Sequence, residues 1–266
     1  MQIDSSLIHA FLHDLPMEQS SGYSYVSGFQ QPDSKRKDVV SALLSELETI
    51  VEEFPVFNQD IWLSLFSDMD ELLASLTIIP VVGSTSAPMR TEVFKHNVII
   101  LDLIHIADYT RILSQMTYIM QNYITLEITK LCIRHRYPLS THHYLDMLDD
   151  MTFTHGLANW LAWNRNCKEY KFQDVRYEPH KEKAFGMLAQ AITIENKALQ
   201  HTVLHKALHS DFWNQFTAVA GMFYFDDVYH DIGKDGILLL YRHGPKHFIH
   251  TIFHTNDKYN IRFLKS

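Results

Sequence analysis

The chain has 266 residues, of which 46% are hydrophobic and 20% charged, and its formal net charge is -8. This composition is that of an ordinary globular protein and excludes a disordered chain. A negative net charge gives no general attraction to nucleic acid or to anionic membranes, so we expect neither as a partner.

The N-terminal part of the chain changes character near residue 36. Residues 1–35 are predicted to be an irregular segment, because Ser, Gly, Pro and Asp concentrate there. From Asp38, apolar residues recur at helical spacing until Pro55, and a second helical segment is predicted from Ile61 to Leu76. We interpret the apolar faces of both helices as core.

Helical periodicity is lost between Thr77 and Ala107, where short stretches are rich in β-branched residues. This pattern predicts at least two strands. The second is expected to be central in its sheet, because Val98–Leu101 is apolar without alternation. Helix returns at about Asp108 and is predicted to continue to Arg136.

The C-terminal half is predicted to be helical throughout. The predicted helices are Leu145–Trp163, which we expect Gly156 to interrupt, then Glu182–Leu208, Phe212–Ile232 and the shorter Ile237–Tyr241. Gly233 fits the end of the third, because glycine adopts positive φ without penalty.

These elements predict a fold that is mainly α with a small β-sheet, an α+β class. We expect one domain over residues 36–266, with helices and the small sheet in residues 36–107 and a helical half in residues 108–266. The 9 glycines and 8 prolines are too few for an all-β barrel or sandwich.

Several features indicate a cytoplasmic protein. The N-terminus has no basic stretch followed by an apolar one, as a secretory signal would, and no run approaches the roughly 20 apolar residues that span a bilayer. Cys132 and Cys167 are too few for a disulfide framework, and we interpret them as reduced core thiols.

The stretch Tyr118–Pro138 is predicted to be a long, largely buried helix whose middle turn is Leu126-Glu127-Ile128-Thr129-Lys130. Many zinc peptidases carry H-E-x-x-H at such a place, where two histidines bind the metal and the glutamate acts on its water. Here the glutamate is present and both histidine positions hold other residues.

Three segments together resemble the gluzincin-type zinc metallopeptidases of bacteria, a zincin-like family: Tyr123–Leu131, Phe153–Trp163 and Phe212–Phe248. The resemblance implies that Leu126 and Lys130 replace the two zinc histidines. It places His155 where the family has a glutamate as third ligand, and it makes Glu127 the retained general base. Leucine has no donor atom and a protonated lysine repels a cation, so no metal is expected at this site.

The resemblance therefore implies a zincin-like domain that has lost zinc-dependent hydrolysis and binds a peptide or protein partner without cleaving it. Two alternatives stay open. Glu127 and Lys130 can form a plain surface ion pair, which contributes a few tenths of a kcal/mol. Alternatively, a repurposed pocket uses Glu127, Lys130 and His155 for acid–base chemistry without zinc.

The 17 histidines suggest zinc or another divalent metal elsewhere in the chain. His201, His205 and His209 lie four residues apart on one predicted helix, a spacing that suits two metal ligands. A similar cluster near the C-terminus comprises His247, His250 and His254. The simpler interpretation is a solvated or half-buried histidine stripe.

The sequence His230-Asp231-Ile232-Gly233-Lys234 reproduces the motif of HD-type metal phosphohydrolases. In such an enzyme His230 and Asp231 bind the metal, with His201 or His205 as the upstream ligand and Asp257 as the late aspartate. Few residues follow the motif, whereas an HD domain needs further helices there. The alternative is an exposed last helical turn, where a histidine is favoured by the helix dipole.

Overall fold

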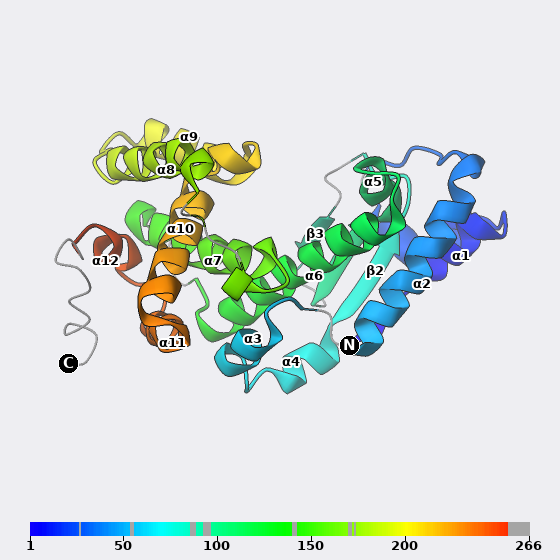
Figure 1. The fold of residues 1–266 in the computed structure, drawn as a ribbon. Helices are drawn as coiled ribbons and strands as arrows, with labels where there is room; N and C mark the ends of the chain where they lie inside the picture. Colours follow the sequence, from blue (N-terminus) through cyan, green and yellow to red (C-terminus); the bar gives the residue numbers. More distant parts are fainter. Residues whose placement is uncertain are drawn as a thin grey trace. The chain divides into compact units, whose positions relative to one another are not determined.

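The computed structural model describes residues 1–26, 28–53, 56–85, 89–92, 97–139, 143–169, 172 and 174–254, with the backbone alone at 89–92. The chain divides into two compact units. Unit 1 comprises Met1–Phe57 and Phe66–Leu131, and unit 2 comprises Asn58–Leu65 and Cys132–Ser266. The prediction of a mainly α fold with a small sheet is confirmed (Figure 1).

Unit 1 contains the sheet. Among the described residues, the sheet has four strands, β1 (Gln2–Ile3), β2 (Thr77–Val81), β3 (Met89–Glu92) and β4 (Val98–Asp102). The strand order is β1-β2-β4-β3, with β1, β2 and β4 parallel and β3 antiparallel to β4. The predicted central position of β4 is confirmed, and its five side chains are all buried, as expected for a strand covered on both faces.

Two predictions about unit 1 are corrected by its helices. Residues 1–35 are not irregular throughout, because they contain β1 and the helix α1 (Ser6–Leu12), whose Leu7 and Ile8 are fully buried. Residues 103–107 form a helix rather than the end of a strand. Asp102 caps this helix, α5 (Leu103–Asp108), by accepting hydrogen bonds from two of its first amides.

The remaining helices of unit 1 are α2 (Lys37–Glu53) and α4 (Asp70–Ser75), followed by the larger part of α6 (Leu113–Arg136). The helix predicted from Ile61 to Leu76 is in fact two helices, α3 (Gln59–Leu65) and α4. The polar pair Ser67-Asp68 lies in the turn between them and favours a turn over a continuous helix.

Unit 2 is helical in its described part. Besides α3 and the end of α6, it contains α7 (Tyr144–Trp163), α8 (Glu178–Ala191), α9 (Lys197–His209), α10 (Phe216–Ile232), α11 (Lys234–His243) and α12 (Phe248–His254). Short 3₁₀ segments occur in both units, at Met17–Gln19, Ser21–Tyr25, Ser34–Arg36, Cys167–Glu169, Val175–Tyr177 and Phe212–Asn214.

The core of unit 2 is the contact between α7 and α10. The sequence suggested that Gly156 interrupts α7, but the helix is continuous there. Gly156 lies where α7 meets Gly221 of α10. A Cβ atom added at Gly156 would lie 2.6 Å from the Gly221 Cα, which is closer than real Cβ contacts allow. The two glycines therefore allow the backbones of α7 and α10 to approach closely.

Three further details of unit 2 differ from or agree with the prediction. Glu182–Leu208 is two helices, because Asn196 caps α9 by accepting from the amides of Ala198 and Leu199. Gly233 ends α10 with φ 80°, as predicted. The helix α12 was not predicted.

No helix in the described ranges has the length and apolarity needed to cross a membrane.

Candidate functional site

The turn of α6 that resembles a zinc motif carries a buried ion pair. Glu127 is 4% exposed, and its Oε1 pairs with the Nζ of Lys130 one turn further along the helix. The Lys130 side chain is 23% exposed, so it reaches solvent only in part. The carboxylate is thus enclosed in the protein, unlike that of a plain surface ion pair.

The two positions that the resemblance assigns to zinc histidines lie on one side of α6. Leu126 and Lys130 are half-buried, as is Tyr123 one turn earlier, whereas Ile128 and Thr129 are buried. Residues four apart lie above one another on a helix. The less buried side of the helix therefore includes the two positions that the resemblance assigns to zinc ligands.

His155, the third predicted site residue, is half-buried on α7. Its carbonyl oxygen accepts a hydrogen bond from the Asn159 side-chain amide at 2.7 Å. Glu127 and Lys130 belong to unit 1 and His155 belongs to unit 2. Neither compact unit by itself contains all three residues of the predicted pocket.

The histidine clusters lie at the surface. His201 and His205 are exposed on α9, and the rings of His205 and His209 are 4.5 Å apart between centroids. On α12 the rings of His250 and His254 stack at 3.8 Å. Within the described residues, no group of three or more His, Cys, Asp or Glu side chains is arranged to hold a metal ion.

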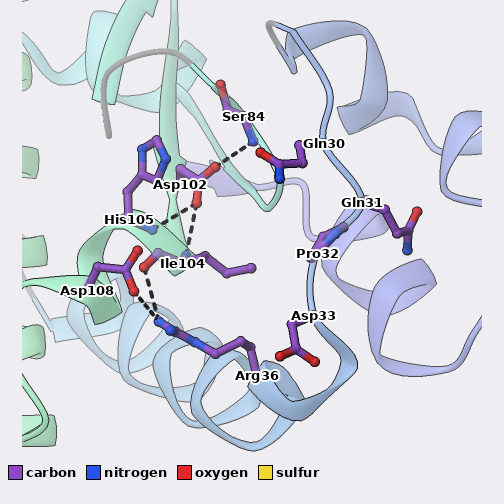
Figure 2. Close-up of a pocket in the computed structure, with 11 residues that line it drawn as sticks. Gln30, Gln31, Pro32, Asp33, Arg36, Ser84, Asp102, Ile104, His105 and Asp108 are labelled. Atoms are coloured by element: carbon purple, nitrogen blue, oxygen red, sulfur yellow. Dashed lines mark hydrogen bonds and ion pairs between the residues drawn. The ribbon is translucent and has the colours of Figure 1, made fainter.

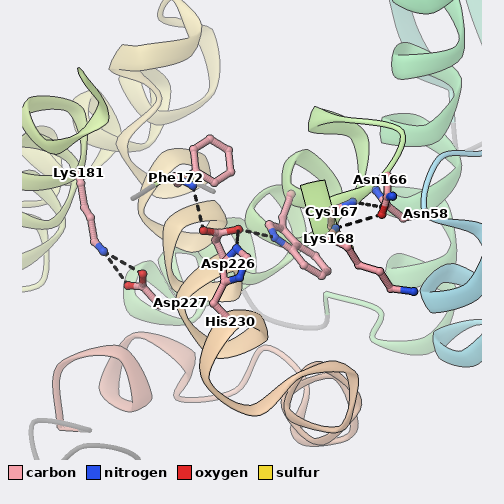
Figure 3. A network of polar contacts seen from close by, with 10 residues as sticks. Asn58, Asn166, Cys167, Lys168, Phe172, Lys181, Asp226, Asp227 and His230 are labelled. Carbon is pink, nitrogen blue, oxygen red and sulfur yellow. Dashed lines mark hydrogen bonds and ion pairs between the residues drawn. The ribbon is translucent and has the colours of Figure 1, made fainter. Parts of the chain in front are cut away.

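The histidine and aspartate of the HD-like motif have different environments. Asp231 is exposed, whereas His230 is half-buried with its Nε2 3.4 Å from the Oδ1 of Asp226 (Figure 3). His230 thus pairs with the aspartate one turn earlier on α10. Asp257, the predicted late aspartate, lies outside the described residues.

Asp226 is the centre of a polar network in unit 2 (Figure 3). It is 1% exposed and accepts hydrogen bonds from the Trp160 indole at 3.3 Å and from the backbone amide of Phe172 at 3.2 Å. Burial raises the pKa of this carboxyl, while the neighbouring His230 opposes the shift. The network connects α10 to α7 and to the segment before α8, which is a structural role.

Asn58 has a comparable structural role in the same unit. Its side chain donates to the carbonyls of Leu161 and Asn164, both at 2.8 Å, and accepts from the amide of Cys167 at 2.7 Å. Cys167 is buried, and burial raises the pKa of its thiol. Both cysteines are buried outside any disulfide, as predicted, and the raised pKa of Cys167 disfavours a reactive thiolate.

A cavity of about 300 Å³ lies in unit 1 at the carboxyl ends of β2 and β4 (Figure 2). This edge is where open sheets with parallel strands hold their ligands. The cavity is lined by the loop at Gln30–Asp33, by Arg36, by Gly83 and Ser84 after β2, and by Asp102 and α5 residues after β4.

Asp102 organises one wall of this cavity. The side chain is 1% exposed, and its two oxygens accept backbone hydrogen bonds from Ser84 at 2.9 Å, Ile104 at 2.9 Å and His105 at 3.1 Å (Figure 2). Burial raises the pKa of Asp102, although these donors and the nearby His105 favour its ionised form. The residue joins the end of β2 to the start of α5.

The sequence prediction did not include this cavity. The available signal was polar residues directly after two apolar strands, namely Gly83-Ser84 after β2 and Asp102 at the end of β4. Because carboxyl ends of parallel strands lie at the same edge of a sheet, a prediction that the two strands are parallel would have placed these residues side by side.

Comparison with known proteins does not assign the chain to a family. No protein-family model, no curated protein and no solved structure matches the chain.

Proposed function

We propose that this protein is a zincin-like peptide-binding protein that no longer hydrolyses its ligand, with the Leu126–Lys130 turn as the remnant of a zinc motif. The observation that carries the proposal is the buried ion pair between Glu127 and Lys130. A glutamate that acts on zinc-bound water needs the metal beside it. Here a lysine ammonium provides the positive charge instead.

The charge balance of the turn explains why the glutamate persists without zinc. A buried carboxylate without a counter-charge is strongly destabilising. Lys130 neutralises Glu127 from the position where the family has its second zinc histidine, and Leu126 fills the first with an apolar side chain. These replacements are mutually consistent, since together they remove the ligands and keep the carboxylate compensated.

The sheet of unit 1 supports the peptide-binding part of the proposal. β3 is the last strand on its side of the sheet in the described part of the chain, and it pairs with β4 only. The outer backbone groups of an edge strand are a template for an added strand. We propose that an extended peptide binds by adding to β3 through main-chain hydrogen bonds.

Metal content tests the zincin part of the proposal. The untagged wild-type protein is expected to contain no stoichiometric zinc by mass spectrometry. The double variant Leu126→His, Lys130→His restores the H-E-x-x-H pattern on α6 and is expected to bind zinc, because two histidines one turn apart suit the metal. The single variant Leu126→His is the matched control and is expected to bind zinc more weakly.

Two results would contradict this part of the proposal: stoichiometric zinc in the wild-type protein, or no zinc in a folded double variant. The peptide-binding part is tested separately with fluorescein-labelled β-casein, an unfolded protein. We expect its anisotropy to rise on adding the wild-type protein while its size on a gel stays unchanged. Cleavage of the casein, or no change in anisotropy, would refute peptide binding without hydrolysis.

A further inference from the structure

The cavity at the carboxyl edge of the unit 1 sheet has preformed walls. Asp102 fixes the loop after β2 to the start of α5 through three backbone hydrogen bonds. The backbone amide of Gln30 donates to the Gly83 carbonyl at 2.9 Å, which holds the opposite loop in place. Gly83 has φ +79°, and a Cβ atom there would collide with the Gln30 carbonyl. Preformed walls of this kind are typical of ligand sites.

The charged groups of the cavity are unequal in sign. Three carboxylates line it, those of Asp33, Asp102 and Asp108, against one guanidinium, that of Arg36. Arg36 is already paired, since its Nη2 lies 2.7 Å from Asp108 and 3.4 Å from the Ile104 carbonyl (Figure 2). Asp33 and Asp108 are both exposed, so each has oxygens that a ligand can reach. The excess negative charge favours a cationic ligand.

The arrangement favours an organic cation over a metal ion. In the described part of the chain, no three carboxylate, imidazole or thiol groups are placed to coordinate one metal ion, here or elsewhere. The carboxylates instead lie on separate elements around a space of about 300 Å³, which is the lower end of the size of small-molecule sites. An extended ligand with several N–H donors matches separated acceptors better than a spherical ion does.

We propose that this cavity binds a small organic cation that carries an amine or guanidinium group, with Asp108 and Asp33 as its charged partners. Neither residue lies on α6 or β3, so the inference does not rest on peptide binding or on the zincin resemblance. Failure of one proposal leaves the other untouched.

Isothermal titration calorimetry of the full chain at low ionic strength tests the proposal with agmatine, putrescine and inorganic phosphate. We expect saturable binding of agmatine and no binding of phosphate. Asp108→Asn is expected to weaken agmatine binding about tenfold, because one charge-assisted contact contributes about 1.4 kcal/mol. Arg36→Gln removes the competing cation and is expected to strengthen binding several-fold.

The matched control is Asp231→Asn, which removes an exposed carboxylate from unit 2 and is expected to leave agmatine binding unchanged. Circular dichroism verifies that each variant is folded. The proposal is overturned if neither amine binds, if a folded Asp108→Asn variant binds agmatine as the wild type does, or if phosphate binds and is lost in Arg36→Gln. The last result would identify an anion site.

Discussion

Glu127 in unit 1 and two carboxylates in unit 2, those of Asp226 and Asp149, are all buried and are stabilised in different ways. In unit 1, Glu127 of α6 is neutralised by Lys130, three residues further along the same helix. In unit 2, Asp226 of α10 accepts hydrogen bonds from α7 and from the segment before α8. Asp149 of α7 likewise accepts from the backbone amides at His247 and Ile249, at 3.0 and 2.7 Å. A local pair exists wherever the helix forms, whereas long-range donors require the tertiary structure.

This difference gives the carboxylates different structural consequences. Asp226 and Asp149 each join elements that are far apart in the sequence, since Asp149 connects α7 to the start of α12. The Glu127–Lys130 pair connects two turns of one helix. Changes in unit 2 that separate its helices are therefore expected to have larger effects than changes to the local pair of unit 1.

The largest effect is expected from Gly221→Ala. A Cβ atom at Gly221 would overlap the backbone carbonyl of Thr152 and lie 2.9 Å from the Gly156 Cα, and neither backbone atom can move as a side chain can. The substitution therefore pushes α7 away from α10. This movement also breaks the Trp160–Asp226 hydrogen bond, which joins the two helices. We expect the free energy of unfolding to fall by about 3 kcal/mol, measured by urea denaturation.

Gly186→Ala is the matched control for this prediction. Gly186 is exposed within α8, and a Cβ atom there would meet nothing within 4 Å. Because alanine favours helix over glycine, this variant is expected to gain about 1 kcal/mol. Equal losses in both variants would show that the close approach of α7 and α10 does not limit stability.

The sequence predicted the local features of the fold and missed those that depend on tertiary contacts. Helical periodicity identified α2, α6 and α10, and the apolar run at Val98–Leu101 identified a central strand. Gly156 was assigned to a helix break because its partner, Gly221, lies 65 residues later. A single sequence does not show which two glycines will meet.

The site predictions follow the same division. The Glu127–Lys130 pair was visible because both residues lie on one helix, and the structure adds that its carboxylate is buried. The structure also adds a contact of His230 that the motif does not include, since its Nε2 lies 3.4 Å from the Oδ1 of Asp226 at i-4. The cavity beside Asp102 was missed because its walls come from three separate stretches of the chain.

The second largest effect is expected on the pH dependence of stability, through the buried carboxyl of Asp149. Burial raises the pKa of this carboxyl from 3.8 to about 6, although two backbone amides donate to it. The folded state therefore binds a proton more tightly than the unfolded state between these two values. The protonated form therefore contributes to the free energy of unfolding below pH 4, and this contribution is lost as pH rises through 6. The loss amounts to at most about 3 kcal/mol.

Asp149→Asn isolates this contribution, because asparagine does not titrate. Urea denaturation at intervals from pH 4 to 7 is expected to show the free energy of unfolding falling more steeply in the wild type than in the variant. Parallel pH profiles for the two proteins would contradict the raised pKa. Asparagine also weakens the hydrogen bonds to the start of α12, which changes the free energy of unfolding at every pH. The test is therefore the slope of the free energy of unfolding against pH, and its value at one pH does not decide the question.

The smallest effect is expected for the local pair. Lys130→Ala leaves the Glu127 carboxylate buried without its cation, and we expect a loss of about 2 kcal/mol in the free energy of unfolding, less than for a fully buried pair because Lys130 is 23% exposed. The double variant Glu127→Met, Lys130→Met replaces both charges by apolar side chains of similar length. It is expected to recover most of that loss.

A double-mutant cycle with these positions decides whether burial makes the pair stronger than a surface contact. A coupling energy above about 1 kcal/mol is expected, since an exposed pair at this helical spacing contributes only about 0.2–0.5 kcal/mol. The pair Asp14–Lys37 of the same unit, in which the Asp14 side chain is 84% exposed, is the matched reference. Equal coupling in the two cycles would mean that Glu127 gains nothing from its buried position. Lys130 would then be no substitute for the charge of a metal ion.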